Sequence, residues 1–343
     1  MTKQIVLRRG WVGARSLVAI AGLLSLSALS MTVGKFDAGL SDLIGQIWAT
    51  MVGGTPSDET VATVFWNIRL PRVLAGLAVG AALAAAGATY QGLFRNPLVS
   101  PDILGVSAGA SFGAVVGIFL SLPVGVIQLM SFVGGLIAVL SVYAVATVIR
   151  NRDPVLVLVL AGIAVGAHVG AGISLIKILA DPYDQLPAIT YWLLGSLASV
   201  TSGDVVSILP ALVVGIIPLF LLRWRMNVMT LGEEEARALG IDTGRLRVVL
   251  VLAATLITSA SVSVTGIIGW IGLVIPHVAR LLVGPDFVRL LPVSMALGAA
   301  YLLVADMLAR SIAMIEVPLG ILTATVGAPF FLWLLASGRK GWQ

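Results

Sequence analysis

Few side chains in this sequence could carry out chemistry, and their spacing does not form a catalytic site. The chain has no Cys, which removes thiolate chemistry, disulfides and Cys-ligated metals. Its two His, His168 and His277, are too far apart in sequence to build a metal site by themselves. Asp306 and Arg310 stand four residues apart, the spacing of a local ion pair on one helix. With no paired carboxylates or clustered His, we expect neither an enzyme nor a metal site.

The most polar stretch runs from Arg223 to Arg247 and carries the pattern of one short helix. Thr230 is expected to cap it, with Glu233 completing a capping box. Three consecutive Glu then fall where the helix dipole favours negative charge, and Gly240 supplies a left-handed end. A helix over Leu231–Leu239 would be about 13 Å long, too short to be stable alone in water. We therefore hypothesise that this helix rests on another protein.

The composition around this stretch is that of a membrane protein. Hydrophobic residues make up 59% of the 343 and charged residues 11%, with a mean hydropathy of +1.06. Soluble domains carry about 25% charged residues. The net charge of +5 comes from scattered Arg rather than a basic block, so we expect membrane lipid, and no nucleic acid, as a partner. The phosphate loop G-x-x-x-x-G-K-[ST] is absent, so nucleotide-driven transport would need a partner that binds the nucleotide.

Ten apolar stretches are long enough for membrane-spanning helices. The third and eighth are the least regular, because Gly and Pro interrupt or bound them. The first follows a basic head at residues 1–16 and is interpreted as a retained span, since the apolar core of a signal peptide is usually shorter. The stretches are Leu17–Val33, Val73–Phe94, Ile103–Leu120, Val126–Ile149, Val155–Leu179, Val205–Leu222, Val248–Val264, Ile267–Val283, Leu290–Ala309 and Leu319–Ala336.

The basic residues predict the orientation of these spans. With the N-terminus in the cytoplasm, sixteen of the 21 Lys and Arg fall in cytoplasmic segments, a strong positive-inside bias. Both termini and residues 223–247 are then cytoplasmic, and residues 34–72 form an outer loop. The five basic residues left outside are Lys35, Arg69, Arg72, Lys177 and Arg310.

The outer loop is predicted to contain an interfacial helix, because apolar side chains recur at helical spacing between residues 40 and 51. Arg69 and Arg72 follow, flanking a Pro where the second span opens. Snorkelling at a helix end would explain two such Arg. Their place on the side that the charge bias disfavours points equally to binding.

Small residues recur every fourth position in three spans, at residues 76–84, 105–117 and 162–170. Such stripes let helices approach closely in lipid, so we predict a compact bundle rather than a pore lined by these faces. His168 lies in the third of these spans. A hydrogen bond inside the bundle is its first interpretation, and contact with a transported ligand the second. The segment Phe94–Asp102, with two Pro, is expected to turn at the cytoplasmic membrane surface.

Four blocks of this sequence resemble the permease family of ABC importers for iron–siderophores, haem and cobalamin. The blocks run in order from the second span onward: Arg69–Ala110, Leu231–Ile241, Gly269–Asp286 and Val304–Leu335. The resemblance implies one all-α permease domain over residues 1–343, with about ten transmembrane helices, of which helices 2–5 and 7–10 form inverted repeats. It also implies a bacterial or archaeal cell membrane, a second permease subunit, two ATPase subunits and an outer solute-binding protein.

The resemblance assigns roles to individual positions. The coupling helix, which sits in a groove of the ATPase, falls on Glu233, Glu234, Glu235, Ala236, Arg237, Leu239 and Gly240. The Arg residues that meet acidic residues of the binding protein fall on Arg69, Arg72 and Arg310, although Asp306 competes for the last.

The resemblance also places the gates. Asn96 and Leu98 match the family's cytoplasmic gate, and a second gate would fall near Val155 and Leu156, an apolar pair where a family member has a polar one. His277 is then structural. No cofactor is implied for this chain, because ATP and Mg would be bound by the partner ATPase.

The expected function is ATP-driven import of a metal chelate by alternating access. Iron–siderophore is the default ligand, with haem, cobalamin and oxyanions such as molybdate left open. The alternative is a secondary transporter driven by an ion gradient, which needs intramembrane acids. Asp306 is the nearest candidate, and the mid-span regions otherwise lack Asp and Glu.

Overall fold

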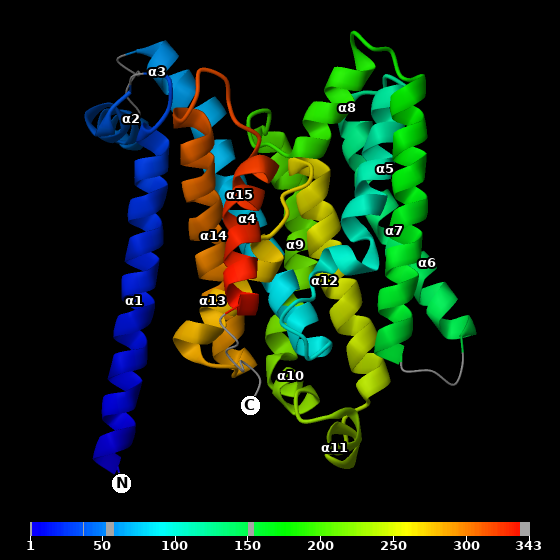
Figure 1. Ribbon diagram of the computed structural model, residues 1–343. Helices are drawn as coiled ribbons and strands as arrows, with labels where there is room; N and C mark the ends of the chain where they lie inside the picture. The colour runs from blue at the N-terminus through cyan, green and yellow to red at the C-terminus, as the bar shows by residue number, and fades with distance from the viewer. Residues whose placement is uncertain (1, 37, 53–57, 150–153, 337–343) are drawn as a thin grey trace.

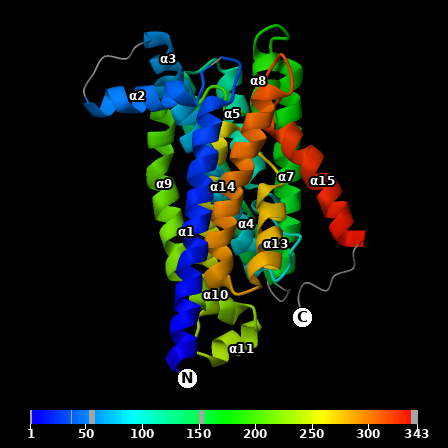
Figure 2. The same ribbon diagram turned by 90° about the vertical axis from the view of Figure 1, so that its left-hand side faces the viewer.

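In a computed structural model the chain is a bundle of helices, shown from two directions in Figures 1 and 2. The structure describes residues 2–36, 38–52, 58–149 and 154–336. Within these ranges the regular elements are helices, which confirms the all-α prediction. They are α1 (Thr2–Thr32), α2 (Leu40–Val52), α3 (Glu59–Thr63), η1 (Val64–Arg69), α4 (Leu70–Leu93), η2 (Pro101–Leu104), α5 (Val106–Phe119), α6 (Val124–Val148), α7 (Pro154–Leu179), α8 (Gln185–Leu194), α9 (Ser202–Leu221), α10 (Arg223–Met229), α11 (Glu233–Ala238), α12 (Thr243–Thr265), α13 (Ile271–Val283), α14 (Phe287–Ser311) and α15 (Leu319–Ala336).

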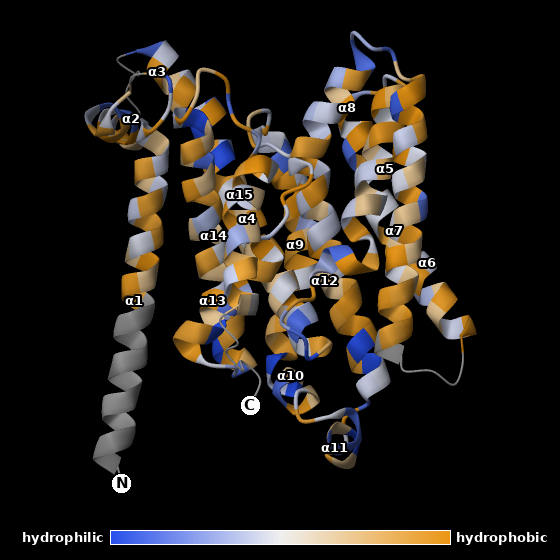
Figure 3. Ribbon diagram, viewed as in Figure 1, coloured by the Kyte–Doolittle hydropathy of each residue, from blue (hydrophilic) through white to orange (hydrophobic). Residues whose placement is uncertain are grey.

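The bundle has two polar ends separated by an apolar middle (Figure 3). We name one the α2 end; it carries α2, α3, α8 and the connection from α14 to α15 (Figure 1). The other is the α11 end, where α10, α11 and the connection from α13 to α14 lie. The amphipathic helix predicted between residues 40 and 51 is α2, which lies across the axis of α1. The helices α3, η1, α8 and α10 were not predicted.

In the part of the chain that the structure describes, six helices are long and apolar enough to cross a membrane: the continuous run Glu59–Leu93, α6, the stretch Leu156–Leu179 of α7, α9, α12 and α14. Four shorter apolar helices fall on the remaining predicted stretches: Leu17–Thr32, α5, α13 and Leu319–Leu334. The irregular third and eighth stretches are therefore α5, with 14 residues, and α13, with 13. Both begin later than predicted, because η2 and the non-helical Gly269–Trp270 precede them.

The helices α4–α7 and α12–α15 form two inverted repeats, as the resemblance implied. The chain runs through the two sets in opposite directions (Figure 1). Their contacts also correspond: α4 packs on α13 and α14, and α12 packs on α5 and α6. Within the repeats, α5 packs on α6 as α13 packs on α14.

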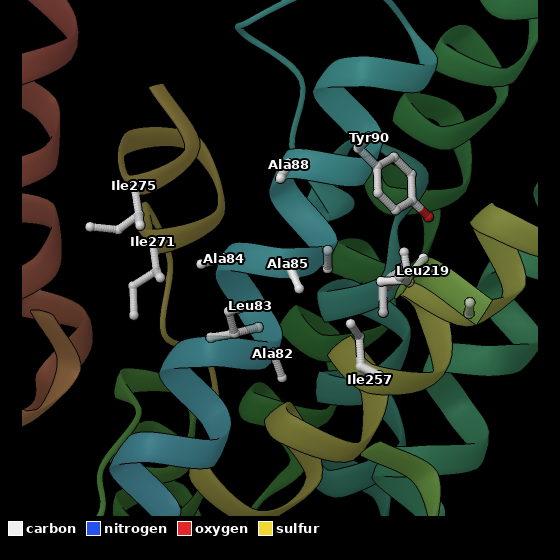
Figure 4. Packing of buried hydrophobic residues seen from close by; sticks show 14 of the residues in the cluster. Ala82, Leu83, Ala84, Ala85, Ala88, Tyr90, Leu219, Ile257, Ile271 and Ile275 are labelled. Carbon is white, nitrogen blue, oxygen red and sulfur yellow. The ribbon is translucent and has the colours of Figure 1, made fainter. Parts of the chain in front are cut away.

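The centre of the bundle is formed by α4 and α12. The most apolar 18 residues are 78% buried both in the run Glu59–Leu93, which contains α4, and in α12, against 22% in α7. Figure 4 shows Ala82–Ala85 of α4 packed between α13 on one side and Leu219 and Ile257 on the other. Small side chains are required there. A Cβ on Gly80 would lie 2.3 Å from the carbonyl oxygen of Gly298 in α14, and one on Gly113 would lie 2.0 Å from that of Met130 in α6.

The small-residue stripes on α4 and α5 thus pack against neighbouring helices, as predicted. The stripe on α7 does so only at its start, where a Cβ on Gly162 would lie 2.0 Å from the carbonyl oxygen of Ile103. At Gly166 and Gly170 an added Cβ meets open space. The prediction that all three stripes pack inside the bundle was therefore wrong for the second half of α7.

Candidate functional site

The polar stretch Arg223–Arg247, which we call the α11 knuckle, folds as the short helices α10 and α11 and the start of α12, at the α11 end (Figure 1). The predicted capping box does not form. Since α10 continues to Met229, Thr230 ends that helix and donates to the Asn227 carbonyl oxygen at 2.6 Å. Gly232 precedes α11 instead. The predicted left-handed end is present: Gly240 has φ +80° and donates to the carbonyl oxygen of Arg237 at 2.9 Å.

One face of α11 rests on the chain itself. Ala236 is fully buried, and α11 packs against α10 and α12. Glu233 accepts from Arg237 Nη2 at 2.6 Å and from Arg247 Nη2, on α12, at 3.0 Å. Thr243 Oγ1 lies 3.3 Å from Glu233 Oε1. The chain's own α10 and α12 thus support one face of α11, and the hypothesis that this helix also rests on another protein stays a prediction.

The Glu233 carboxylate is held in its charged form. Burial alone would raise its pKa, but the hydrogen bond and charge of Arg247, followed by Arg237 and Thr243, hold the pKa below the usual 4.5. Glu233 and Arg247 thus form a permanent brace between α11 and α12 at neutral pH.

A second brace, which was not predicted, ties the knuckle to α14. Asn227 Nδ2 on α10 donates to Asp286 Oδ1 at 2.6 Å, and Asn227 Oδ1 accepts from the Phe287 N–H at 2.7 Å. Asp286 also caps α14 by accepting from the Val288 N–H at 3.1 Å. In sequence, 59 residues separate Asn227 from Asp286, so no local pattern could reveal the pair. The first brace thus joins α11 to α12, and the second joins α10 to α14.

The opposite face of α11 is exposed. Leu239 is 64% exposed and Leu231 61%, unusual for Leu on a polar segment. The seven predicted coupling residues therefore divide into two groups. Glu233 and Ala236 face the chain's own helices, whereas the exposed group is Glu234, Glu235, Arg237, Leu239 and Gly240.

At the α2 end, three buried charged residues and one half-buried Glu form what we call the arginine cluster: Arg72, Asp306, Arg310 and Glu316. Arg72 Nε donates to Asp306 Oδ1 at 2.7 Å, and its Nη2 to Glu316 Oε2 at 2.8 Å. Arg310 Nη2 forms the predicted ion pair with Asp306 Oδ2 at 3.0 Å. The Glu316 side chain is 34% exposed, the most of the four. Burial would raise its pKa, but the hydrogen bond and charge of Arg72 hold the pKa below 4.5.

Two Arg of this region also fasten α1. Arg69 Nη1 donates to the Met31 carbonyl oxygen at 2.6 Å, just before α1 ends. Arg310 Nη1 donates to the Val33 carbonyl oxygen at 2.8 Å. The three Arg expected at the binding-protein surface are thus at most 6% exposed, and each is bonded within the chain. Their docking role stays a prediction, and Glu316 is the cluster's accessible member.

The segment predicted as a gate is a rigid turn after α4. Asn96 is exposed and accepts from the Leu98 N–H through Oδ1 at 2.9 Å, while Arg95 takes a left-handed φ of +48°. Of the second predicted gate, Leu156 is exposed in the first turn of α7, and the side chain of Val155 lies outside the described residues.

His168 lies on the exposed side of α7 rather than inside the bundle. It lines an apolar cavity of about 810 Å³ between α5, α6 and α7, together with Phe112 and Val133. The expectation of a hydrogen-bonded interior position was therefore wrong, and a pathway role stays a prediction. Among the described residues no group of three or more His, Cys, Asp or Glu could hold a metal ion.

Inverted helical repeats, half-helices in matching positions and a braced polar knuckle define a multi-pass membrane protein of the transporter class. The sequence match is more specific. Residues 21–337 match the FecCD transport family, and the chain belongs to that family.

Named relatives are permease proteins of import systems. The chain is 46% identical to the cobalamin import system permease protein BtuC of Halobacterium salinarum, over 81% of this chain and 74% of the relative. It is 35% identical to the hemin transport system permease protein HmuU of Yersinia pestis, over 93% and 96%. The molybdate import system permease protein MolB of Haemophilus influenzae is 34% identical, over 93% and 94%. A solved metal-chelate type ABC transporter, in an inward-facing conformation, has a TM-score of 0.83 at 33% identity, covering 94% of this chain and 98% of its own.

Proposed function

We propose that this permease imports a metal chelate, with iron–siderophore as the default, by coupling to ATPase subunits at the α11 end. The cargo enters at the α2 end from a solute-binding protein and leaves at the α11 end. The α11 end is then cytoplasmic, as the predicted positive-inside bias requires. Relatives named for cobalamin, haem and molybdate support a small metal-containing cargo without selecting one.

The observation that carries the proposal is the two-sided build of α11. Its buried side is braced to α12 by Glu233 and Arg247, and α10 is braced to α14 by Asn227 and Asp286. Its exposed side presents Leu239 among charged groups. A partner that buried Leu239 would grip a segment fixed to two spanning helices, so its motion would reach the membrane region. ATP and Mg would be bound by that partner, and the permease would change which end of the path is open.

A second permease subunit, whether a copy or a different chain, is expected on the exposed side of α7. Gly166 and Gly170 leave open space there, which would let another helix approach closely. The path would run between the two subunits. Asn96 and Leu98 would close it at the α11 end, with His168 a further candidate along it.

The binding protein would dock at the α2 end on Arg69, Arg72 and Arg310. Docking would exchange one ion-pair partner for another, because an acidic side chain of the binding protein would replace a carboxylate of this chain. Glu316 now occupies one edge of Arg72, and it is the partly exposed carboxylate of the arginine cluster. An acidic side chain of the binding protein could take that edge when Glu316 leaves. The charge of Arg72 would then stay paired before and after docking.

The test is reconstitution in liposomes with an ATPase and a binding protein encoded beside the permease. Uptake of a radiolabelled ferric siderophore should require all three proteins and internal ATP. Uptake that persists without the ATPase and follows the proton gradient would establish the secondary transporter instead. The control is a Leu239→Asp, Leu231→Asp permease, in which the exposed apolar contacts are lost while both braces remain.

A further inference from the structure

Two short helices start in the middle of the bundle rather than at its ends. Gly105, with φ +76°, precedes α5, and Trp270, with φ +71°, precedes α13. The two starts lie side by side, since a Cβ on Gly272 would be 3.4 Å from Cδ of Pro101. They occupy matching places in the two inverted repeats. Transporters form binding sites where helices are interrupted in such places. The left-handed backbone conformation of Trp270 is strained, and such strain is typical of functional sites.

A cavity of about 240 Å³ lies between these two starts. It is bounded by Leu83 of α4 and Thr258 of α12. Leu83 is ten residues from one end of α4 and 13 from the other, which places it about 15–20 Å from each end. The cavity is therefore near mid-depth. Its polar lining includes Ser100, Asp102, Ser107, Thr258 and the backbone at Gly269.

Asp102 lies at the depth of this cavity, although it follows a polar turn in the sequence. Ser107 Oγ donates to its Oδ1, and Ser100 Oγ lies 3.5 Å from its Oδ2. The described residues that line the cavity include no Lys, Arg or His. The nearby Arg280 is not among the lining residues; it donates to Gln91 at 3.1 Å, and Gln91 in turn donates to the Leu273 carbonyl oxygen at 3.0 Å.

Asp102 is also an exposed residue on the surface of this single chain, although the hydroxyls of Ser100 and Ser107 contact its carboxylate. A carboxylate at mid-depth on such a residue does not face hydrocarbon. This side of the bundle must therefore border water or another polypeptide. The expectation that mid-span regions lack acidic residues other than Asp306 was wrong, because the sequence does not reveal that residues 94–102 fold back into the bundle.

We propose that the Asp102 cavity is a binding site for an organic cation, the ammonium or protonated amine of a passing cargo. A bare metal ion would require more oxygen ligands than one carboxylate and three hydroxyls beside Leu83, Val262 and Ile268. Free oxyanions are disfavoured by the same carboxylate. The placement of this site on a transport path rests on the proposed function. The attraction of the site for cations is independent of that function.

The natural absence of Cys provides a direct test in the full chain. Ser100→Cys and Leu273→Cys each place one thiol on the cavity lining. Each variant, in nanodiscs, is treated with one of two methanethiosulfonate reagents, a cationic one that bears trimethylammonium or an anionic one that bears sulfonate. The rate of thiol modification by each reagent is divided by the rate at which that reagent modifies a small thiol free in solution. We expect the cationic reagent to react about tenfold faster at both positions. Tetramethylammonium should slow that reaction.

Three controls separate the proposal from its alternatives. Asp102→Asn should bring the two normalised rates together, whereas Asp184→Asn, exposed at α8, should leave the preference unchanged. Leu140→Cys, 56% exposed on α6, should react slowly with both reagents because it faces lipid. Equal rates beside Asp102, or a preference that survives Asp102→Asn, would overturn the proposal. Failure of ATP-dependent uptake would overturn the proposed function and leave this result intact.

Discussion

Arg72 and Asp306 form a buried ion pair across two helices: Nε of Arg72 lies 2.7 Å from Oδ1 of Asp306, with side chains 5% and 0% exposed. Arg72 belongs to the start of α4 and Asp306 to α14, so the pair joins the two inverted repeats at the α2 end. Asp306 also holds Arg310. The residue considered for ion coupling is thus already paired twice.

Asp306→Asn should destabilise the protein strongly. The substitution keeps the shape of the side chain but leaves Arg72 and Arg310 with one fewer negative charge in a buried site. Loss of one partner of a buried pair costs about 3–5 kcal/mol. Thermal unfolding in detergent measures the effect, and Asp184→Asn, an exposed change at the same end, is the control. An unchanged melting temperature for Asp306→Asn would show that the cluster does not stabilise the fold.

Glu316→Gln should strengthen docking of the binding protein. The change removes the Glu316 charge from one edge of Arg72, so Arg72 and Arg310 then share the single carboxylate of Asp306. We expect roughly three- to tenfold tighter binding, because a partner's carboxylate no longer competes with Glu316. Surface plasmon resonance with the permease in nanodiscs measures this. The matched control is Glu59→Gln, an exposed acid of the same end; equal affinities for both variants would contradict exchange at Arg72.

The pH dependence follows from two carboxylates whose pKa values are held below 4.5, Glu233 by Arg247 and Glu316 by Arg72. A lowered folded-state pKa stabilises the protein fully above the ordinary value and loses that effect as pH falls through the lowered one. The stabilisation that these pairs add should therefore be constant from pH 8 to pH 5, and the melting temperature should fall below about pH 4.5. Glu316→Gln should make the acid decline shallower. A decline centred near pH 6.5 would implicate His instead.

Some of these features follow from the sequence alone, and others do not. Apolar length located the spanning stretches, and charge bias gathered Lys35, Arg69, Arg72, Lys177 and Arg310 at one end. Charge bias does not report burial, so the arginine cluster was invisible until Asp306 and Glu316 were seen beside it. Hydropathy likewise cannot show where a chain folds back. The start of α5 inside the bundle, with Asp102, is therefore found only in three dimensions.

Gly113→Ala and Gly166→Ala should behave differently although both lie in small-residue stripes. A Cβ at Gly113 meets the Met130 carbonyl oxygen at 2.0 Å, so α5 and α6 must separate, at about 1–3 kcal/mol. A Cβ at Gly166 meets open space within one chain. Gly166→Ala should therefore keep the melting temperature of the isolated chain, and Gly166→Leu should weaken permease pairing in cross-linking. Undisturbed pairing in Gly166→Leu would place the second subunit elsewhere.

Glu234→Ala with Arg237→Ala should weaken ATPase binding by about tenfold without a large loss of stability, since both side chains are exposed and the Arg237–Glu233 pair is worth only about 0–1 kcal/mol. Glu233→Gln should lower both binding and melting temperature, because it removes the brace to Arg247. Co-purification with the ATPase and thermal unfolding separate the two effects. Identical profiles for the two variants would show that α11 has no distinct partner face.

The brace between Asn227 and Asp286 offers the sharpest test of force transfer. Asn227→Ala removes the bonds to Asp286 and to the Phe287 N–H. The ATPase should still bind, because the exposed face of α11 is unchanged, but less of its motion reaches α14. We expect ATP hydrolysis to continue while uptake per ATP falls several-fold.

A swapped pair distinguishes coupling from simple destabilisation. With Asn227→Asp and Asp286→Asn together, an amide still donates to a carboxylate and the Phe287 N–H keeps an acceptor. In the unchanged protein the Val288 N–H shares Asp286 Oδ1 with Asn227, so its cap is weakened in the swap and in Asp286→Asn alike. Either single change breaks this pattern, since Asn227→Asp places two carboxylates together and Asp286→Asn loses the charge. Uptake per ATP should therefore recover in the swap and stay low in each single variant. The melting temperature of the swap could recover while uptake per ATP does not. That outcome would mean that the contact between residues 227 and 286 only holds α10 and α14 together. Motion would then reach the membrane through Glu233 and Arg247 instead.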